Sequence, residues 1–139
     1  MEKTLILVKP DAVNRQLSGK IISRFEEKGL KVVALKMLHM DEALGKRHYA
    51  PHVGKAFFPE LLQYMTSSPI VAAVLEGEGA VEKVRKIMGT TNPAKADPGT
   101  IRKDFALDMT RNSIHGSDSP ETAATEIKLF FKDSEIFRY

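Results

Sequence analysis

A histidine among small polar residues is the feature of this sequence best suited to chemistry. Residues 112–119 read NSIHGSDS, so His115 stands beside Gly116 and a run of short polar side chains. Neutral imidazole is a nucleophile near neutral pH, and a glycine lacks the Cβ that would crowd a group approaching the ring. The pattern therefore indicates a catalytic histidine. The same residue types also form tight turns, in which His115 would be incidental.

Cationic side chains near such a histidine would favour phosphate chemistry, because phosphoryl transfer depends on positioning and charge stabilisation. Arg85 lies at the border of an apolar helical stripe, whereas Lys83 and Lys86 point away from that stripe. A border arginine can equally cover the core with its aliphatic stem. Arg102 and Lys9 carry no distinguishing pattern of their own.

Common catalytic and nucleotide-binding motifs are absent. There is no Gly-x4-Gly-Lys-Ser/Thr loop, and Gly77-Glu78-Gly79 lacks the third glycine of a dinucleotide fingerprint. Ser117 is not in a Gly-x-Ser-x-Gly elbow, and Ile114 stands where a histidine phosphatase needs arginine. A serine hydrolase or a phosphatase is therefore disfavoured.

His48 and His52 have the i, i+4 spacing of a helical metal pair. Pro51 lies between them, however, and no Glu-x-x frame accompanies them. A structural or surface role is favoured for this pair.

Length and composition predict one domain over residues 1–139, since a chain of this size with 42% hydrophobic residues can bury one core. Apolar runs such as Ile70–Leu75 are too short to cross a bilayer, and residues 1–3 lead directly into a strand and not into a signal peptide. We therefore expect a soluble, cytoplasmic protein with no membrane partner. The absence of cysteine excludes disulfides and thiolate metal sites. The net charge of +3 favours small anionic ligands about as well as nucleic acid.

The apolar pattern predicts the elements that must position these side chains. Strands are expected at Leu5–Val8, Leu30–Met40, Ile70–Leu75 and Asn112–His115. Helices are expected from Leu17 to a stop at Gly29, from a cap at Asp41 to Tyr49, from Pro59 to Met65, from Val81 to Gly89, and from a cap at Ser119 to Phe131.

The segment Thr90–Ala106 holds two prolines and has no clear period, so it is predicted to be a long loop. The whole order is strand, helix, strand, helical insert, strand, helix, loop, strand, helix. It favours an α/β (α+β) fold, a ferredoxin-like βαββαβ sandwich in which helices cover one face of a four-stranded antiparallel sheet.

Several segments together resemble the nucleoside diphosphate kinase family. RNSIHGSDS at residues 111–119 resembles the active-site signature of that family. The other segments come in the family's order and spacing: TLILVKPDAV at 4–13, HYAPH at 48–52, GTTNPAKADPGTIRKDFA at 89–106, and Glu126. The resemblance runs from about residue 3 to the C-terminus, and a signature of this length is specific. The known fold of the family is of the ferredoxin-like type.

The resemblance implies a ping-pong phosphotransferase. His115 would take the γ-phosphate of a nucleoside triphosphate as a phosphohistidine and give it to a nucleoside diphosphate. Glu126 would hydrogen-bond the ring nitrogen that is not phosphorylated, and Tyr49 would lie beside the imidazole. The implied nucleotide-binding residues are Arg85, Thr91 and Arg102 for the phosphates, Lys9 and Asn112 for the sugar hydroxyl, and Phe57 and Met109 for the two faces of the base.

The same resemblance implies that Mg²⁺ arrives with ATP or another nucleotide and is held largely by substrate phosphates, without a protein metal cage. Asp118 would orient a metal-bound water or the backbone, or act only as a turn or cap residue. Because only apolar side chains would touch the base, broad base specificity is expected. The family forms homo-oligomers, as tetramers or hexamers, and the end of the chain at Tyr139 inclines the expectation toward the tetramer.

The sequence departs from the family pattern at two positions, and two alternative functions can be weighed against the resemblance. Leu75 replaces a frequent tryptophan, and Met109 stands where smaller aliphatic residues are common in the family. A non-catalytic nucleotide-binding module would lose the histidine, so His115 in its intact surroundings disfavours that function. A nucleic-acid-binding protein is expected to show a basic stripe with interleaved aromatics, and Phe57 is the one aromatic residue we place at a ligand.

Overall fold

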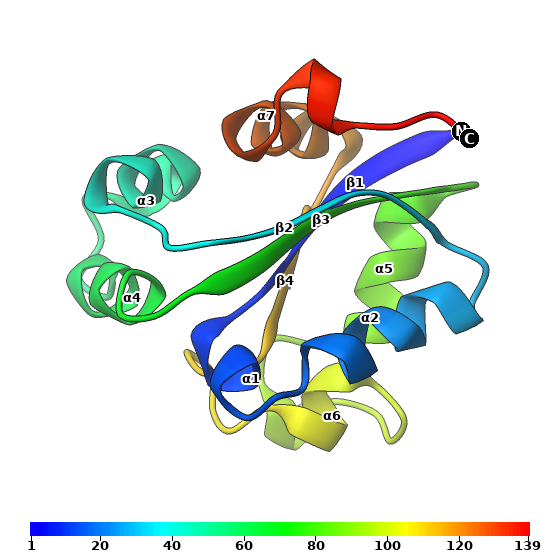
Figure 1. The fold of residues 1–139 in the computed structure, drawn as a ribbon. Helices are drawn as coiled ribbons and strands as arrows, with labels where there is room; N and C mark the ends of the chain where they lie inside the picture. The colour runs from blue at the N-terminus through cyan, green and yellow to red at the C-terminus, as the bar shows by residue number, and fades with distance from the viewer.

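A four-stranded antiparallel sheet forms the centre of the computed structural model, which describes residues 1–139 (Figure 1). The strands are β1 (Glu2–Val8), β2 (Lys31–Leu38), β3 (Ile70–Gly77) and β4 (Ile114–Gly116), in the order β2-β3-β1-β4. Every neighbouring pair runs antiparallel. The predicted ferredoxin-like architecture is confirmed.

Helices cover both faces of the sheet, so the expectation of cover on one face is wrong (Figure 1). The cause lies in the two central strands, β1 and β3, whose side chains enter both cores. In β1, Leu5 and Leu7 join one core and Ile6 and Val8 join the other. A strand that is apolar on both sides must be covered on both. One face carries α3 (Glu42–His48), α4 (Phe58–Met65) and α7 (Pro120–Phe130), and the other carries α1 (Pro10–Asn14), α2 (Ser18–Glu27), α5 (Ala80–Met88) and α6 (Ile101–Phe105).

Local capping residues begin two of the predicted helices as expected. The Oγ of Ser119 accepts a hydrogen bond from the backbone N–H of Thr122 at 3.1 Å at the start of α7. Asp41 accepts one from the N–H of Leu44 at 2.7 Å at the start of α3. None of the helices reaches the length and apolar content that a membrane crossing requires.

Two short helices depart from the sequence prediction. α1 follows β1 directly, and α6 lies inside Thr90–Ala106, the segment predicted to be a loop. Each has 5 residues, too few to repeat an apolar face and produce a recognisable period. α6 is nevertheless anchored, because Thr100 caps it and Ile101 is fully buried. Single 3-10 turns occur at Ala50–His52, Pro93–Lys95 and Asp133–Glu135.

The short strand β4 places the histidine segment against the centre of the sheet. It pairs with β1 in a register that sets His115 opposite Leu7, so the imidazole lies on the face covered by α7. The next residue, Gly116, points to the opposite face, toward α5. A Cβ there would lie 2.5 Å from Met88 Sδ and 3.0 Å from Val84 Cγ1. The glycine is therefore needed for packing against α5, and not for access to the ring as the sequence suggested.

We predict that Gly116→Ala lowers the free energy of unfolding by about 1–3 kcal/mol, the usual effect of an extra methyl group in a packed core. Urea denaturation measures the change. Gly19→Ala is the matched control, since a Cβ at that position in α2 meets nothing within 4 Å. If Gly116→Ala proved as stable as Gly19→Ala, the packing role of Gly116 would be excluded.

Candidate active site

The predicted site residues line one cavity of about 770 Å³. They come from positions as distant in the chain as Lys9 and Glu126, so only the fold brings them together. Asp118 lies on the same wall. The predicted residues in the lining are Lys9, Tyr49, Phe57, Arg85, Thr91, Arg102, Met109, Asn112, His115 and Glu126.

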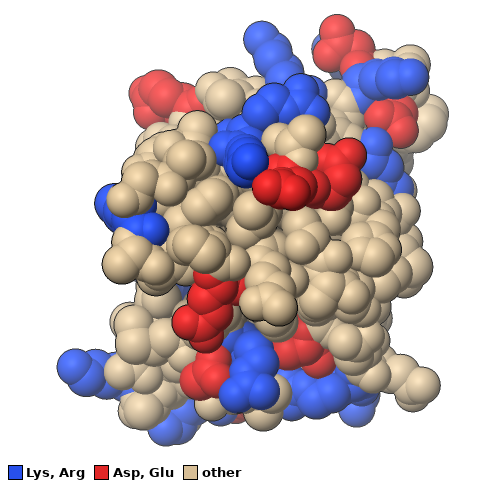
Figure 2. Space-filling model, turned by 90° about the vertical axis from the view of Figure 1, so that its left-hand side faces the viewer, with Lys and Arg blue, Asp and Glu red and all other residues tan.

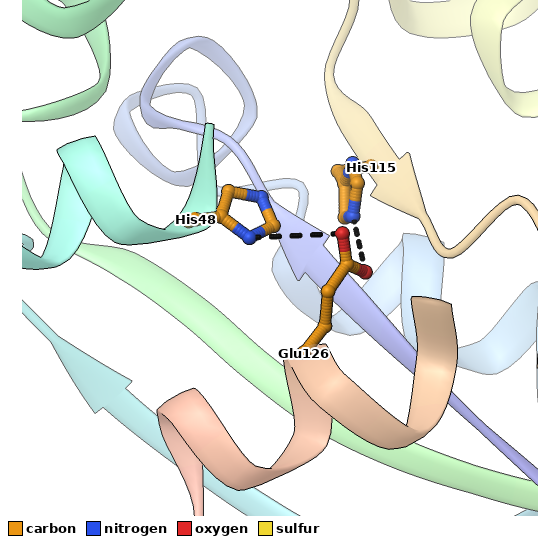
Figure 3. Close-up of side chains that lie close together, drawn as sticks. All are labelled: His48, His115 and Glu126. Carbon is orange, nitrogen blue, oxygen red and sulfur yellow. Dashed lines mark hydrogen bonds and ion pairs between the residues drawn. The ribbon is translucent and has the colours of Figure 1, made fainter. Parts of the chain in front are cut away.

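Glu126 on α7 holds the imidazole of His115 (Figure 3). Nε2 of His115 lies 3.0 Å from Oε1 of Glu126, and the hydroxyl of Ser117 donates to the same oxygen at 2.6 Å. Burial acts to raise the pKa of Glu126, but the hydrogen bonds from His115 and Ser117 outweigh it and hold this pKa below its ordinary value. An ionised carboxylate only accepts hydrogen bonds, so Nε2 carries the ring proton. Nδ1 makes no hydrogen bond within the protein and keeps its lone pair in the neutral ring.

A second histidine, His48 at the end of α3, packs edge to face against His115. The two ring centroids are 4.7 Å apart, at an interplanar angle of 81°. Nδ1 of His48 lies 3.7 Å from Oε2 of Glu126, too far for a hydrogen bond, and neither ring nitrogen has a hydrogen-bond partner. Burial, and after it the neighbouring His115, lower the pKa of His48 to about 3. The ring is therefore neutral, and its contact with Glu126 is not an ion pair.

The sequence did not indicate this position for His48, because α3 reaches His115 only by packing on α7. His48 is buried, which rules out the surface role that its spacing with His52 allowed. His52 belongs to the 3-10 turn beyond α3, with its ring centroid 5.4 Å from that of Phe57. The one local indication that His48 faces inward is its spacing of three residues from Gly45, the other buried residue of α3. Two positions are too few to define the buried face of a helix.

Tyr49 lies next to His48, with ring centroids 4.5 Å apart. Its hydroxyl is buried without a hydrogen-bond partner. Burial, and after it the charge of Glu126, raise the pKa of Tyr49 well above its ordinary value. Tyr49 thus lines the cavity with its neutral hydroxyl buried, and the ring in contact with His115 is that of His48.

Four cations line the cavity, and the three that the sequence singled out have no acidic partner in a salt bridge. Lys9, Arg85 and Arg102 take part in none of the salt bridges of the structure. Burial, and after it Arg102, lower the pKa of Lys9 to about 8. Burial, and after it Arg85, lower the pKa of Arg102 to about 10. Crowded cations that form no salt bridge are unfavourable by themselves, so this arrangement is typical of a site that binds an anion.

Backbone carbonyls of the histidine strand hold the two arginines. Arg85 donates to the carbonyl oxygen of Gly116 at 3.2 Å, and Arg102 donates to that of Ile114 at 2.8 Å. These carbonyls flank His115, so both guanidinium groups are fixed relative to the imidazole. Arg102 comes from α6, one of the helices that the sequence did not predict.

Lys9 follows β1 directly and is fixed by Asn112. Its Nζ donates to Oδ1 of Asn112 at 2.8 Å, and the amide of Asn112 donates in turn to the carbonyl oxygen of Met109 at 3.1 Å and to that of Thr91 at 3.5 Å. One buried amide therefore connects the end of β1 with the segments before β4 and after α5.

Phe57 and Met109 bring apolar surface to the cavity wall. Their exposed fractions are 51% and 59%, so both side chains are open to a ligand in the cavity. The cavity thus combines cations at one part of its lining with two exposed apolar side chains at another, which suits a ligand that is both anionic and flat.

Asp11 is a buried residue that no sequence pattern singled out. Its carboxylate accepts hydrogen bonds from the backbone N–H of Ser113 at 3.2 Å and from the hydroxyl of Ser113 at 2.8 Å, and also from Tyr64 and Arg15. Ser113 has φ of 72°, a left-handed conformation that is uncommon for serine. Asp11 therefore holds the bend that directly precedes β4. Its partner is 102 residues away, which is why no local pattern marks it.

Comparison with known protein families agrees with this geometry. A family model described as nucleoside diphosphate kinase matches residues 2–136. A nucleoside diphosphate kinase of Dehalococcoides mccartyi is 57% identical over 139 residues, which are 100% of this chain and 98% of the relative. One of Methanothermobacter thermautotrophicus is 56% identical and is matched over 93% of its length.

Solved structures show the same similarity. The crystal structure of the Aquifex aeolicus nucleoside diphosphate kinase superposes with a TM-score of 0.95 at 45% identity, covering 98% of this chain and 99% of that chain. The halophilic nucleoside diphosphate kinase of Halobacterium salinarum in complex with CDP gives 0.97 at 46% identity, covering 99% and 92%. The chain therefore belongs to the nucleoside diphosphate kinase family, whose members are phosphotransferases.

Proposed function

We propose that the chain, acting as one domain, transfers the γ-phosphoryl group of a nucleoside triphosphate to a nucleoside diphosphate through a phosphohistidine on His115. The observation that carries the proposal is an imidazole held through Nε2 by Glu126, with Nδ1 free, in a cavity whose lining includes Lys9, Arg85 and Arg102, which form no salt bridge. The CDP complex of the Halobacterium salinarum relative adds support for a nucleotide site on this fold.

In the first half-reaction, the Nδ1 lone pair of His115 attacks the γ-phosphorus in line. The bond from that phosphorus to the β,γ-bridging oxygen breaks, and nucleoside diphosphate leaves. The phosphorylated ring then carries a positive charge with its proton at Nε2, where the Glu126 carboxylate stabilises it. In the second half-reaction, a terminal phosphate oxygen of another nucleoside diphosphate attacks the phosphorus, and the bond to Nδ1 breaks.

The other predicted residues bind the nucleotide in this proposal. Arg85, Arg102 and Thr91 stabilise the phosphates, and their support is the unpaired charge of the two arginines beside His115. Lys9 and Asn112 bind the sugar hydroxyl and nearby oxygens. The exposed side chains of Phe57 and Met109 contact the base, and the neutral hydroxyl of Tyr49 lies near the reacting ring.

Mg²⁺ enters with the nucleotide in the same proposal. Magnesium prefers oxygen ligands and keeps several waters. Glu126 is already hydrogen-bonded to His115 and Ser117, whereas the exposed Asp118 on the cavity wall is available to hold the ion through water. The bound ion neutralises phosphate charge, and Arg85 and Arg102 supply the corresponding charge from the protein.

Homo-oligomer formation belongs to the proposal as well. β2 is an edge strand of the sheet and carries two exposed apolar side chains, Leu35 at 55% and Met37 at 64% exposure. An edge strand of this composition favours pairing with another chain.

The charge on the face that Figure 2 shows gives no specific support to nucleic-acid binding. Figure 2 shows the side of the molecule with α3 and α4, where positive and negative side chains are interspersed and the middle is largely uncharged. A continuous basic stripe, which backbone recognition of a nucleic acid would favour, does not cross this face.

Replacement of the nucleophile tests the proposal directly. His115→Ala should lower kcat by about 10⁴- to 10⁶-fold, because the covalent step is lost, while nucleotide binding measured by calorimetry remains since the cations and Phe57 are intact. His39→Ala, which removes a histidine bonded to the Thr66 carbonyl, should keep wild-type activity. With γ-labelled ATP, the wild type should acquire acid-labile, base-stable label. A His115→Ala rate above about a tenth of the wild-type rate would exclude His115 as the nucleophile.

Base tolerance follows from the proposed contacts. If only Phe57 and Met109 touch the base, no polar group reads its edge, and stacking is tolerant of base identity. ADP, GDP, CDP and UDP should then have kcat/KM values within about two orders of magnitude of one another. Steady-state kinetics with the four acceptors measures this spread. Strict use of one base would indicate a polar contact to the base and would contradict the proposal that only apolar side chains touch it.

The lowered pKa of Lys9 predicts that kcat/KM depends on pH. Its pKa of about 8 means that the free protein loses this positive charge as the pH rises through about 8. Because kcat/KM reports ionisations of the free enzyme, it should fall several-fold between about pH 7 and about pH 9.5. Lys9→Met has no charge to lose, so its kcat/KM should be lower at neutral pH and flat over this range. Parallel profiles for the two proteins would assign the fall to another group.

A further inference from the structure

His48, His115 and Glu126 together offer the ligand atoms of a transition-metal site. One ring nitrogen of each histidine and one carboxylate oxygen lie within 4.8 Å of one another (Figure 3). Two imidazoles and one carboxylate are a ligand set that Zn²⁺ uses in proteins. Mg²⁺, by contrast, prefers oxygen ligands alone. The cluster is therefore chemically distinct from the way in which magnesium accompanies a nucleotide.

His48 supplies an independent indication of a ligand. Its side chain is only 1% exposed, and both of its ring nitrogens lack a hydrogen-bond partner. Buried polar groups without a partner are rare in folded proteins. Nδ1 faces the Glu126 carboxylate at 3.7 Å, beyond hydrogen-bond distance (Figure 3). A buried neutral imidazole placed in this way has a lone pair to offer to a metal ion.

We propose that Zn²⁺ binds Nδ1 of His48, Nε2 of His115 and the carboxylate of Glu126, and that this binding inhibits phosphotransfer. The inhibition rests on the proposed function of His115. Zinc bonds of about 2.0–2.1 Å place tetrahedral ligands about 3.3 Å apart, so ligand atoms now within 4.8 Å of one another approach by up to about 1.5 Å around the ion. A fourth position is left to water on the cavity side, where the His115 side chain is 21% exposed.

The inhibition follows from the tautomer of His115. In the metal-free protein the ring proton is at Nε2, bonded to Glu126, and Nδ1 has the lone pair that reacts. A zinc ion on Nε2 takes the place of that proton, and a neutral imidazole bound through Nε2 carries its proton on Nδ1. The lone pair that would attack phosphorus is then no longer available. Zinc therefore blocks the first half-reaction without touching the cations that bind the phosphates.

Cobalt titration tests the site without using catalysis. Co²⁺ is a visible probe for zinc sites, because its absorption in the visible range becomes intense when tetrahedral coordination replaces its octahedral shell of water. The full chain, free of any histidine tag, should show one such band that saturates at one Co²⁺ per chain and disappears on addition of Zn²⁺. His39→Ala, the matched loss of a histidine elsewhere, should keep the band. His48→Leu and Glu126→Gln should lose it.

Two variants keep the test decisive. Thermal denaturation shows whether His48→Leu is folded. If that variant does not fold, Glu126→Gln, which keeps the shape of the side chain, provides the test. A band that persists in Glu126→Gln and in folded His48→Leu places the cobalt elsewhere and overturns the proposal. Absence of a band from the wild type overturns it equally.

The inhibitory effect has its own measurement. The rate of phosphoenzyme formation from ATP in excess Mg²⁺ should fall as micromolar Zn²⁺ is added. The half-inhibitory zinc concentration should rise at least about 10-fold in His48→Leu, since even loss of a supporting residue weakens metal binding by that factor. Equal zinc sensitivity of wild type and His48→Leu contradicts the proposal. If no phosphoenzyme forms at all but the cobalt band behaves as described, the metal site stands and the proposed function of His115 fails.

Discussion

The antiparallel pairing of β4 with β1 is the constraint on which the site depends. β1 is buried on both faces and paired on both edges, so it is a firmly held strand of the sheet. Its register with β4 sets the imidazole of His115 on the side of α7, within reach of Glu126. The same pairing continues past the strand, because the backbone N–H of Lys9 donates to the carbonyl oxygen of Ser113 at 2.9 Å. The imidazole of His115, the carboxylate that holds it and the cations of the cavity are thus all placed relative to one short pair of strands.

The buried cations of the cavity suit an anionic ligand, but they lower the stability of the folded protein without one. Lys9 and Arg102 are buried without an acidic partner, and their lowered pKa values express the unfavourable loss of hydration. Backbone carbonyls and one amide satisfy part of their hydrogen-bonding capacity without neutralising them. Functional sites commonly carry such local conflicts, which the rest of the fold must offset. An anionic ligand removes the conflict, so binding and stability are coupled at this cavity.

Much of this organisation could be predicted from the sequence, because its determinants are local. The strands, the longer helices and the caps Asp41 and Ser119 follow from residues within a few positions of one another. The motif around His115 is equally local. The remaining features depend on contacts between distant parts of the chain. α6, which contributes Arg102, is too short for a helical period, and neither the burial of His48 against His115 nor the bond from Ser113 to Asp11 has a sequence signature. Helices cover both faces of the sheet because β1 is apolar on both sides. In the sequence, β1 is only a run of apolar residues, which does not show that its two sides face separate cores.

The distance in sequence between the components of the site has a consequence during synthesis. β1 is the first strand to leave the ribosome, yet its partner β4 and the helix α7 are among the last elements to be made. Until then both apolar faces of β1 and one of its edges lack their final cover, a condition that favours aggregation and chaperone binding. Contacts of such long range also slow folding. The residues of the candidate site cannot come together in a nascent fragment that lacks β4 and α7, so acquisition of enzyme activity would report that these late elements have packed onto β1.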